Sequence, residues 1–223
     1  MNYDFLSNNK VYLCGNVVSV PVFSHEIYGE GFYELSLSVP RLSGYNDIIP
    51  ITISERLLTD EDFKIGQKVA VKGQFRSYNK IVDNKSRLLL TVFVREVVEV
   101  DESQNPNVVE ILGFVCKPPI FRTTPFNREI CDVLLAVNRA YNKSDYLPCI
   151  AWGRNARFIK SLAIGEKVIV TGRIQSREYQ KQTDNGGIVK TAYEISICKI
   201  EADSNANAED ARVENSNNGD AVA

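Results

Sequence analysis

The segment SDYLPCIAW (144–152) alternates side chains that suit a protein core with bulkier rings. Successive side chains of an extended strand face opposite sides. The predicted core side carries Leu147, Cys149 and Ala151, and the other side carries Tyr146, Pro148, Ile150 and Trp152. The segment DIIPITIS (47–54) alternates in the same way, with a predicted core side of Ile49, Ile51 and Ile53 and an outer side of Ile48, Pro50, Thr52 and Ser54. Aromatic rings on an outer strand face can stack on unpaired nucleobases. Trp152 could instead be a core residue that caps a barrel, but the alternation favours a binding surface.

Cations gather on one side of the next predicted strand, KVIVTGRIQSREY (167–179). The apolar face of this strand carries Val168, Val170 and Ile174. The opposite face carries Arg173, Arg177 and Tyr179. Cations beside aromatic rings suit a single nucleic-acid strand, because cations attract phosphates while rings stack on bases. The polar loop 179–190 is either a plain hairpin turn or a strand-binding loop. We add four further candidate phosphate contacts: Arg139, Arg154, Lys181 and Lys190.

These residues are positioned by a sequence that occurs twice. VYLCGNVVSVPVF (11–23) and VEILGFVCKPPIF (109–121) align at a spacing of 98, and IGQKVAVKGQ (65–74) aligns with IGEKVIVTGR (164–173). Such repetition predicts two copies of one structural unit. We expect a first domain at 1–102, a second at 103–202 and an acidic tail at 203–223, with DESQNPN (101–107) as the linker. The tail has almost no large apolar residue and is predicted to be disordered.

Each unit contains segments that are rich in β-branched residues or alternate apolar and polar residues, and turn residues bound these segments. They are predicted to be strands, with one helical stretch between the third and the fourth. That stretch is SERLLTDEDF (54–63) in the first unit and GRNARFIKSLAIG (153–165) in the second. Five strands with a helix in that position are the plan of an OB-fold, a small Greek-key barrel. The predicted fold class is therefore all-β, with two tandem OB-fold barrels of five strands.

Charge differs sharply between the two units. Residues 1–102 carry 11 Lys or Arg and 14 Asp or Glu, residues 103–200 carry 14 and 8, and residues 201–223 carry 1 and 6. The basic second unit predicts a polyanionic partner. Nothing approaches the 18 apolar residues of a membrane span, and the start MNYDFLSNNK does not resemble a secretory signal.

Enzymatic and metal-binding functions find no support in the sequence. His25 is the sole histidine and has no catalytic or metal-binding partner pattern nearby, so no nucleophile–histidine grouping can be assembled. The five cysteines have no CxxC spacing and lie in apolar runs, which favours buried thiols in a reducing cytosol over disulfides or zinc. We expect no cofactor and no metal.

The second unit resembles the bacterial single-stranded-DNA-binding protein (SSB) family. The resemblance covers residues 107–201 and rests on NVVEILGFVCKPP, VLLAVNRAY, SDYLPCIAWGRNA, GEKVIVTGRIQSREY and YEISICKIEA in that order. It implies that bases stack on Tyr141, Tyr146, Trp152 and Tyr179. The first unit shares the skeleton but holds Ser43, Ile48, Ser54 and Lys80 at those positions, so it is expected to bind weakly or to be structural.

The sequence thus predicts a cytoplasmic, nucleoid-associated protein that coats single-stranded DNA and supports replication, recombination or repair. The resemblance implies four OB units per assembly, hence a homodimer, in which the outward Ile48 could take part. The family's acidic tail recruits replication and repair proteins through a terminal Pro-Phe, but this chain ends GDAVA, so that route is in doubt. Two alternatives stay open: a primosomal-type adaptor that binds protein, and an RNA-binding OB module.

Overall fold

The computed structural model describes residues 7–58, 63–82, 85–183 and 186–203, and within them the chain is almost entirely β-structure. The strands before the linker are β1 (Asn9–Val17), β2 (Val22–Ile27), β3 (Glu30–Pro40), β4 (Asn46–Ser54), β5 (Lys68–Val82) and β6 (Lys85–Val98). We call them the first barrel. The predicted all-β class with tandem OB-folds is confirmed.

The second barrel repeats this order. Its elements are β7 (Asn107–Val115), β8 (Ile120–Thr123), β9 (Glu129–Arg139), β10 (Lys143–Trp152), the helix α1 (Gly153–Lys160), β11 (Lys167–Thr183) and β12 (Gly186–Ala202). Each barrel has one strand more than the five predicted, because β2 and β8 form short hairpins with β3 and β9. Both are exposed edge segments, and the sequence analysis did not identify them as strands.

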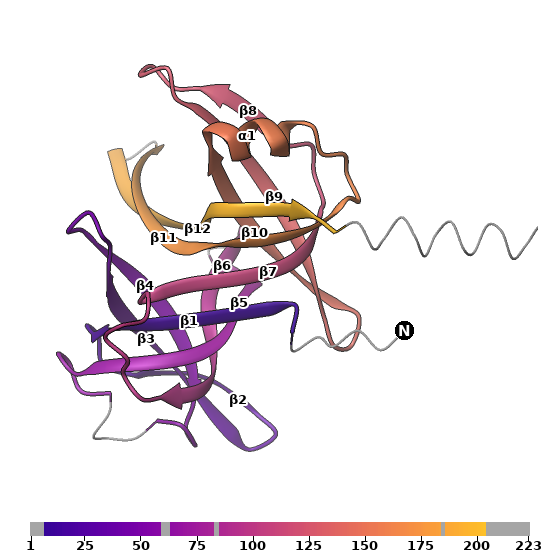
Figure 1. The fold of residues 1–223 in the computed structure, drawn as a ribbon. Coiled ribbons are helices and arrows are strands. Elements are labelled where there is room, and N and C mark those ends of the chain that lie inside the picture. The colour runs from indigo at the N-terminus through magenta and orange to yellow at the C-terminus, as the bar shows by residue number, and fades with distance from the viewer. Residues whose placement is uncertain (1–6, 59–62, 83–84, 184–185, 204–223) are drawn as a thin grey trace, which may run out of the picture.

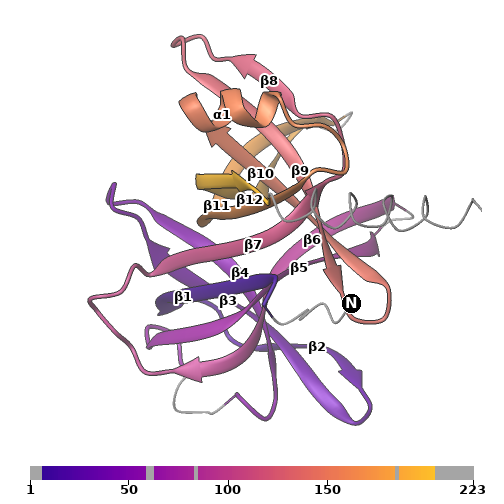
Figure 2. The ribbon, with the colours of Figure 1, turned by 45° about the vertical axis from the view of Figure 1, so that its right-hand side comes forward.

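All twelve strands belong to one hydrogen-bonded sheet, in the order β2-β3-β4-β6-β5-β1-β7-β11-β12-β10-β9-β8. The order is mirrored about its centre, where β1 and β7 pair antiparallel and run side by side across the molecule in both views (Figure 1 and Figure 2). Each half closes into a barrel through a further pairing, β3 with β1 and β9 with β7. The sheet therefore continues from one barrel to the other, and the domain division at 102/103 stays a prediction.

Glycines allow the long strands to bend as each barrel closes. A β-bulge interrupts the β5–β6 ladder beside Gly73, and another interrupts the β11–β12 ladder beside Gly172. A Cβ at Gly73 would lie 2.2 Å from the Phe93 carbonyl oxygen, and one at Gly172 would lie 2.3 Å from that of Ser196. Because these neighbours are backbone atoms, no larger residue fits at either bulge.

The predicted core faces are confirmed in both barrels. The fully buried side chains include Ile49, Ile51 and Ile53 in β4, Leu147 and Ala151 in β10, and Val168, Val170 and Ile174 in β11. Three residues on the predicted outer faces of β4 and β10 are also buried, although strand alternation predicts that they are exposed: Thr52, Ser54 and Ile150. Neighbouring strands supply side chains that cover them, which alternation within one strand cannot reveal.

The helix α1 closes the second barrel, where the sequence predicted it. It begins at Gly153, whose positive φ of 54° turns the chain out of β10, and it buries Ala156 and Ile159 against the core. The corresponding stretch of the first barrel begins with a turn over Glu55–Leu57. Residues 59–62 of the predicted first-unit helix, and nearly all of the predicted disordered tail, lie outside the described residues.

Candidate nucleic-acid interface

The four predicted stacking residues all keep exposed surface, which a stacking role requires. The exposed fraction of the whole residue is 94% for Tyr141, 47% for Tyr146, 43% for Trp152 and 40% for Tyr179. They come from different places: Tyr141 from the β9–β10 turn, where its φ is +61°, Tyr146 and Trp152 from β10, and Tyr179 from β11. The register explains the wide spacing, because Tyr146 and Trp152 stand opposite Ala136 and Ile130, near opposite ends of the β9–β10 pair.

Trp152 lines a cavity of about 550 Å³ that its own barrel provides. The other lining residues are Thr123, Asn127, Arg128, Glu129 and Gly153. The β8–β9 turn, shaped by the positive φ of Asn127, brings the exposed Arg128 to the site. Glu129 also lines the cavity, and its carboxylate lies 3.2 Å from the Arg157 guanidinium, which offsets its charge. Arg128 was missed by the sequence analysis, although the turn signal PFNR beside a cation could have suggested it.

Tyr179 lines a second hollow, a groove of about 420 Å³ between the two long hairpins. The groove has matching walls: Pro50, Tyr78 and Leu88–Thr91 from the first barrel stand opposite Pro148, Tyr179 and Thr191–Tyr193 from the second. The Tyr78 hydroxyl donates a hydrogen bond to Glu34, at 3.2 Å. Burial, followed by the Glu34 charge, raises the pKa of Tyr78 to about 12. Tyr179 therefore faces a groove that both barrels build.

The predicted cations fall into two groups. Arg154 and Arg177 are exposed, and the nearest carboxylate oxygen to the Arg177 guanidinium is that of Glu194, at 3.8 Å. Arg173 and Arg139 are instead half-buried in ion pairs: Arg173 with Asp47 at 3.1 Å, and Arg139 with Asp145 at 3.5 Å. Lys190 is half-buried on β12, opposite Tyr179, and the Lys181 side chain lies outside the described ones.

Asp47 connects the two barrels. Its fully buried carboxylate accepts hydrogen bonds from the guanidinium groups of Arg41 and Arg173 and, at 2.7 Å, from the backbone N–H of Ser176. Burial, followed by the nearby Arg41 charge, lowers the pKa of Arg173. Ile48, which the sequence analysis linked to assembly, lies here as well, with its N–H donating to the Ser176 hydroxyl at 3.2 Å.

The matching junction on the other side is built around Asp145. Its carboxylate accepts the backbone N–H of Ser77 at 2.7 Å, and the Tyr146 N–H donates to the Ser77 hydroxyl at 2.7 Å. Burial raises the pKa of Asp145, although the Ser77 hydrogen bonds and the nearby Arg139 and Arg76 charges oppose that effect. This junction fixes the start of β10 and therefore the position of Tyr146.

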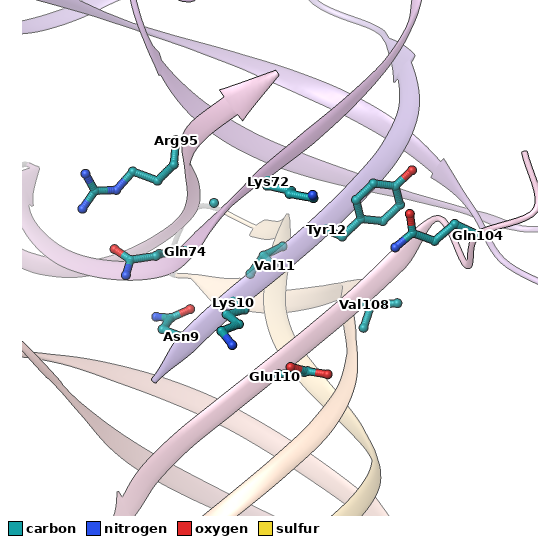
Figure 3. Close-up of a pocket in the computed structure, with 11 residues that line it drawn as sticks. Asn9, Lys10, Val11, Tyr12, Lys72, Gln74, Arg95, Gln104, Val108 and Glu110 are labelled. Carbon is teal, nitrogen blue, oxygen red and sulfur yellow. The ribbon is translucent and has the colours of Figure 1, made fainter. Parts of the chain in front are cut away.

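A further hollow lies elsewhere on the described part of the chain. It measures about 710 Å³ and lies over β1, β5 and β7, with Arg95 and Gln74 at one end and Tyr12 and Gln104 at the other (Figure 3). Its charged lining residues are Lys10, Lys72, Arg95 and Glu110. None of the predicted stacking residues lines it.

Comparison with known proteins finds a family similar to the second barrel. Residues 106–203 match the family described as "Single-strand binding protein family". The matched residues are fewer than half of the 223 in the chain. In the described residues, no helix is long and apolar enough to cross a membrane.

Individual relatives agree with the family match. "Single-stranded DNA-binding protein 1" of Staphylococcus aureus (strain COL) is 34% identical over 83 residues, which are 34% of this chain and 50% of that protein. The protein of the same name from Lactococcus lactis subsp. lactis (strain IL1403) is 32% identical over 83 residues, covering 34% of this chain and 55% of that protein. The matched region thus spans about half the length of these relatives.

A solved structure resembles both barrels together. The wild-type single-stranded DNA binding protein from Thermus aquaticus superposes with a TM-score of 0.69, over 88% of this chain and 93% of that chain. The sequence identity is 18%. At that identity the likeness concerns the fold alone, the tandem arrangement of two OB-fold barrels.

Proposed function

We propose that this protein binds and coats single-stranded DNA, without chemistry and without marked sequence preference. The observation that carries the proposal is the exposure of all four aromatic residues at the family's stacking positions, beside the exposed Arg177 and the cavity that Trp152 shares with Arg128. Rings bind any base through its flat face, and cations bind the phosphates, so affinity does not depend on sequence.

The strand would follow the outer surface of the second barrel. One base stacks on Trp152, with Arg128 and Arg154 near enough in the fold to meet its phosphates. Further bases stack on Tyr146 and Tyr141, and the long β11–β12 hairpin supplies Tyr179 and Arg177, with Lys181 and Lys190 as further cations. Positive charge attracts the strand first, and releases counterions as it binds.

Arg139 and Arg173 have a different role in this proposal. Both are held by buried carboxylates at the junctions between the barrels, so they position the binding surface more than they meet phosphates. A guanidinium that already pairs with a buried carboxylate would have to leave that carboxylate unpaired in order to bind a phosphate, which is costly. We therefore rank Arg177 and Arg154 above Arg139 and Arg173 as phosphate contacts.

The assembly is proposed to be a homodimer with four OB units, serving DNA replication, recombination or repair in the cytoplasm. The domain limits are proposed at 1–102 and 103–202. Sedimentation equilibrium of the full chain tests the dimer, whose mass should be twice the 25.0 kDa of one chain. A mass of one chain at micromolar concentration would contradict it.

The function is tested by titrating the protein with poly-dT while following tryptophan fluorescence. Trp152 is the sole tryptophan, so the signal reports on one place. Stacked bases should quench it until a stoichiometric end point is reached. Competition between matched oligo-dT and oligo-U then separates DNA from RNA preference. Binding detected by anisotropy with no change in fluorescence would remove Trp152 from the site, and no binding to either polymer would overturn the proposed function.

A further inference from the structure

The first barrel carries its own aromatic surface, at strand positions that differ from those of the second. In the second barrel, Trp152 of β10 stands opposite Ile130 of β9. In the first barrel, the matching pair in β4 and β3 is Ser54 and Phe32. The aromatic member of the pair is therefore on β10 in the second barrel and on β3 in the first. The absence of an aromatic residue at Ser54 therefore does not leave this part of the first barrel without rings.

A second ring joins Phe32 across the small residues of β4. Phe93 of β6 stands beside Thr52, and its ring centroid lies 5.7 Å from that of Phe32. On the other side of Phe32, the ring of His25 from β2 stacks at 5.1 Å with an interplanar angle of 11°. The result is a row of rings, His25–Phe32–Phe93. Phe32 is 7% exposed and supports the row, whereas His25 is exposed and Phe93 is half-buried.

Two arginines complete this row on the side of Phe93. The guanidinium carbon of Arg76 lies 4.0 Å from the centre of the Phe93 ring, and that of Arg95 lies 5.5 Å from it. Arg95 occupies the β-bulge of β6, where the matching bulge of β12 holds Cys198. The residue that matches Arg76 is Gln175. These cations are therefore features of the first barrel and are absent from the second.

The positive charge of this cluster is only partly compensated. Arg76 donates to Gln74 at 2.9 Å, but its buried Nε has no hydrogen-bond partner among the described residues. Burial, followed by the charges of Arg95 and Arg139, lowers the pKa of Arg76 to about 10, and the nearby Asp145 opposes this. An anion beside Arg76 and Arg95 would relieve this repulsion. The one carboxylate that acts on Arg76 here, that of Asp145, is outnumbered by the three guanidinium groups of Arg76, Arg95 and Arg139.

We propose that the first barrel is a second binding platform for single-stranded nucleic acid, built from His25, Phe93, Arg76 and Arg95. Bases stack on the exposed side of the ring row, and phosphates meet the two arginines. This inference rests on the proposed function and gives the first unit an active part in it. The platform adjoins the second barrel at Asp145, which accepts the N–H of Ser77, the residue after Arg76, and which precedes Tyr146 in β10. A nucleic-acid strand bound to both barrels would therefore pass between Tyr146 and Arg76.

The test compares two oligomer lengths on the full chain. Oligo-dT of about 10 nucleotides fits within one OB-fold, and oligo-dT of about 30 nucleotides needs roughly two. The variants are Phe93→Leu, which keeps the apolar packing but removes the ring, and Arg95→Gln, which changes an exposed side chain. Lys64→Gln is the matched control, because Lys64 is an exposed cation of the same barrel outside the platform.

For the long oligomer, Phe93→Leu should weaken binding by about 5- to 150-fold, the usual loss of one stacked base. Arg95→Gln should flatten the slope of log affinity against log salt by about 0.7. The short oligomer should still quench Trp152 in both variants, and Lys64→Gln should behave as the unchanged protein does. This inference would be overturned if both platform variants bound the long oligomer with unchanged affinity and an unchanged salt slope. Because Trp152 would still be quenched in that case, the proposed function would remain. If instead the unchanged protein binds neither oligomer, the proposed function itself has failed.

Discussion

The buried carboxylate of Asp145 accepts the backbone N–H of Ser77, 68 residues earlier in the chain, at 2.7 Å. The same bond recurs in mirrored form, because Asp47 accepts the backbone N–H of Ser176 at 2.7 Å. These two bonds place the start of β10 against β5 and the start of β4 against β11, so each barrel fixes part of the other. The β1–β7 ladder supplies the third attachment between the barrels.

The first prediction concerns this junction. Asp47→Ala should lower the free energy of unfolding by about 3–5 kcal/mol, the usual cost of removing one partner of a buried ion pair. The value should fall toward the lower end, since Arg41 and Arg173 keep some contact with water. Urea unfolding followed by circular dichroism measures the change. The control is Asp101→Ala, which removes an exposed carboxylate from the linker and should change stability little.

The second prediction isolates base stacking. Trp152→Ala should weaken oligo-dT binding by about 1–3 kcal/mol, measured by anisotropy of a labelled oligomer. The salt slope should stay the same, because no cation is removed. Ser54→Ala changes the matching position of the first barrel, which holds no ring, and should leave affinity unaltered. The contrary outcome is a Trp152→Ala protein that is mostly unfolded but whose folded fraction binds oligo-dT with unaltered affinity. That result would show that Trp152 belongs to the core.

The third prediction separates two arginines on the same strand. Arg177→Gln should flatten the salt slope by about 0.7 if its guanidinium meets one phosphate, with little effect on stability. Arg173→Gln should mainly reduce stability, because its guanidinium pairs with the buried carboxylate of Asp47. Salt titrations of affinity, paired with urea unfolding of each variant, give both quantities. Equal slopes and equal stabilities for the two variants would contradict this division.

The fourth prediction concerns pH. Folding raises the pKa of Tyr78 from 10.0 to about 12, so between these values the unfolded chain loses the proton first. The contribution of Tyr78 to stability is therefore fully present below pH 10 and declines as the pH rises toward 12. Tyr78→Phe removes this titration, so the variant should lose less stability over that interval than the unchanged protein. Denaturant midpoints at several pH values, each compared between the two proteins, measure the difference.

Local pattern was enough to predict most of the β-structure. Strand alternation placed Ile49, Ile51 and Ile53 in the core correctly, because a strand buries one face whatever its neighbours are. The repeat at a spacing of 98 predicted two similar barrels, since similar sequences pack similar cores. The aromatic residues at the family's positions were also correctly expected to keep exposed surface.

Only the tertiary structure decided which arginines pair with a buried carboxylate and which aromatic rings contact one another. Arg173 and Arg177 share one strand face, yet only Arg173 reaches Asp47, because the partner comes from the other barrel, 126 residues away. The row His25–Phe32–Phe93 escaped notice because its rings come from three strands, and each looks ordinary in its own segment. Sequence alternation tells which side of a strand a residue takes. What stands on that side depends on sheet order and barrel closure, which bring distant segments together.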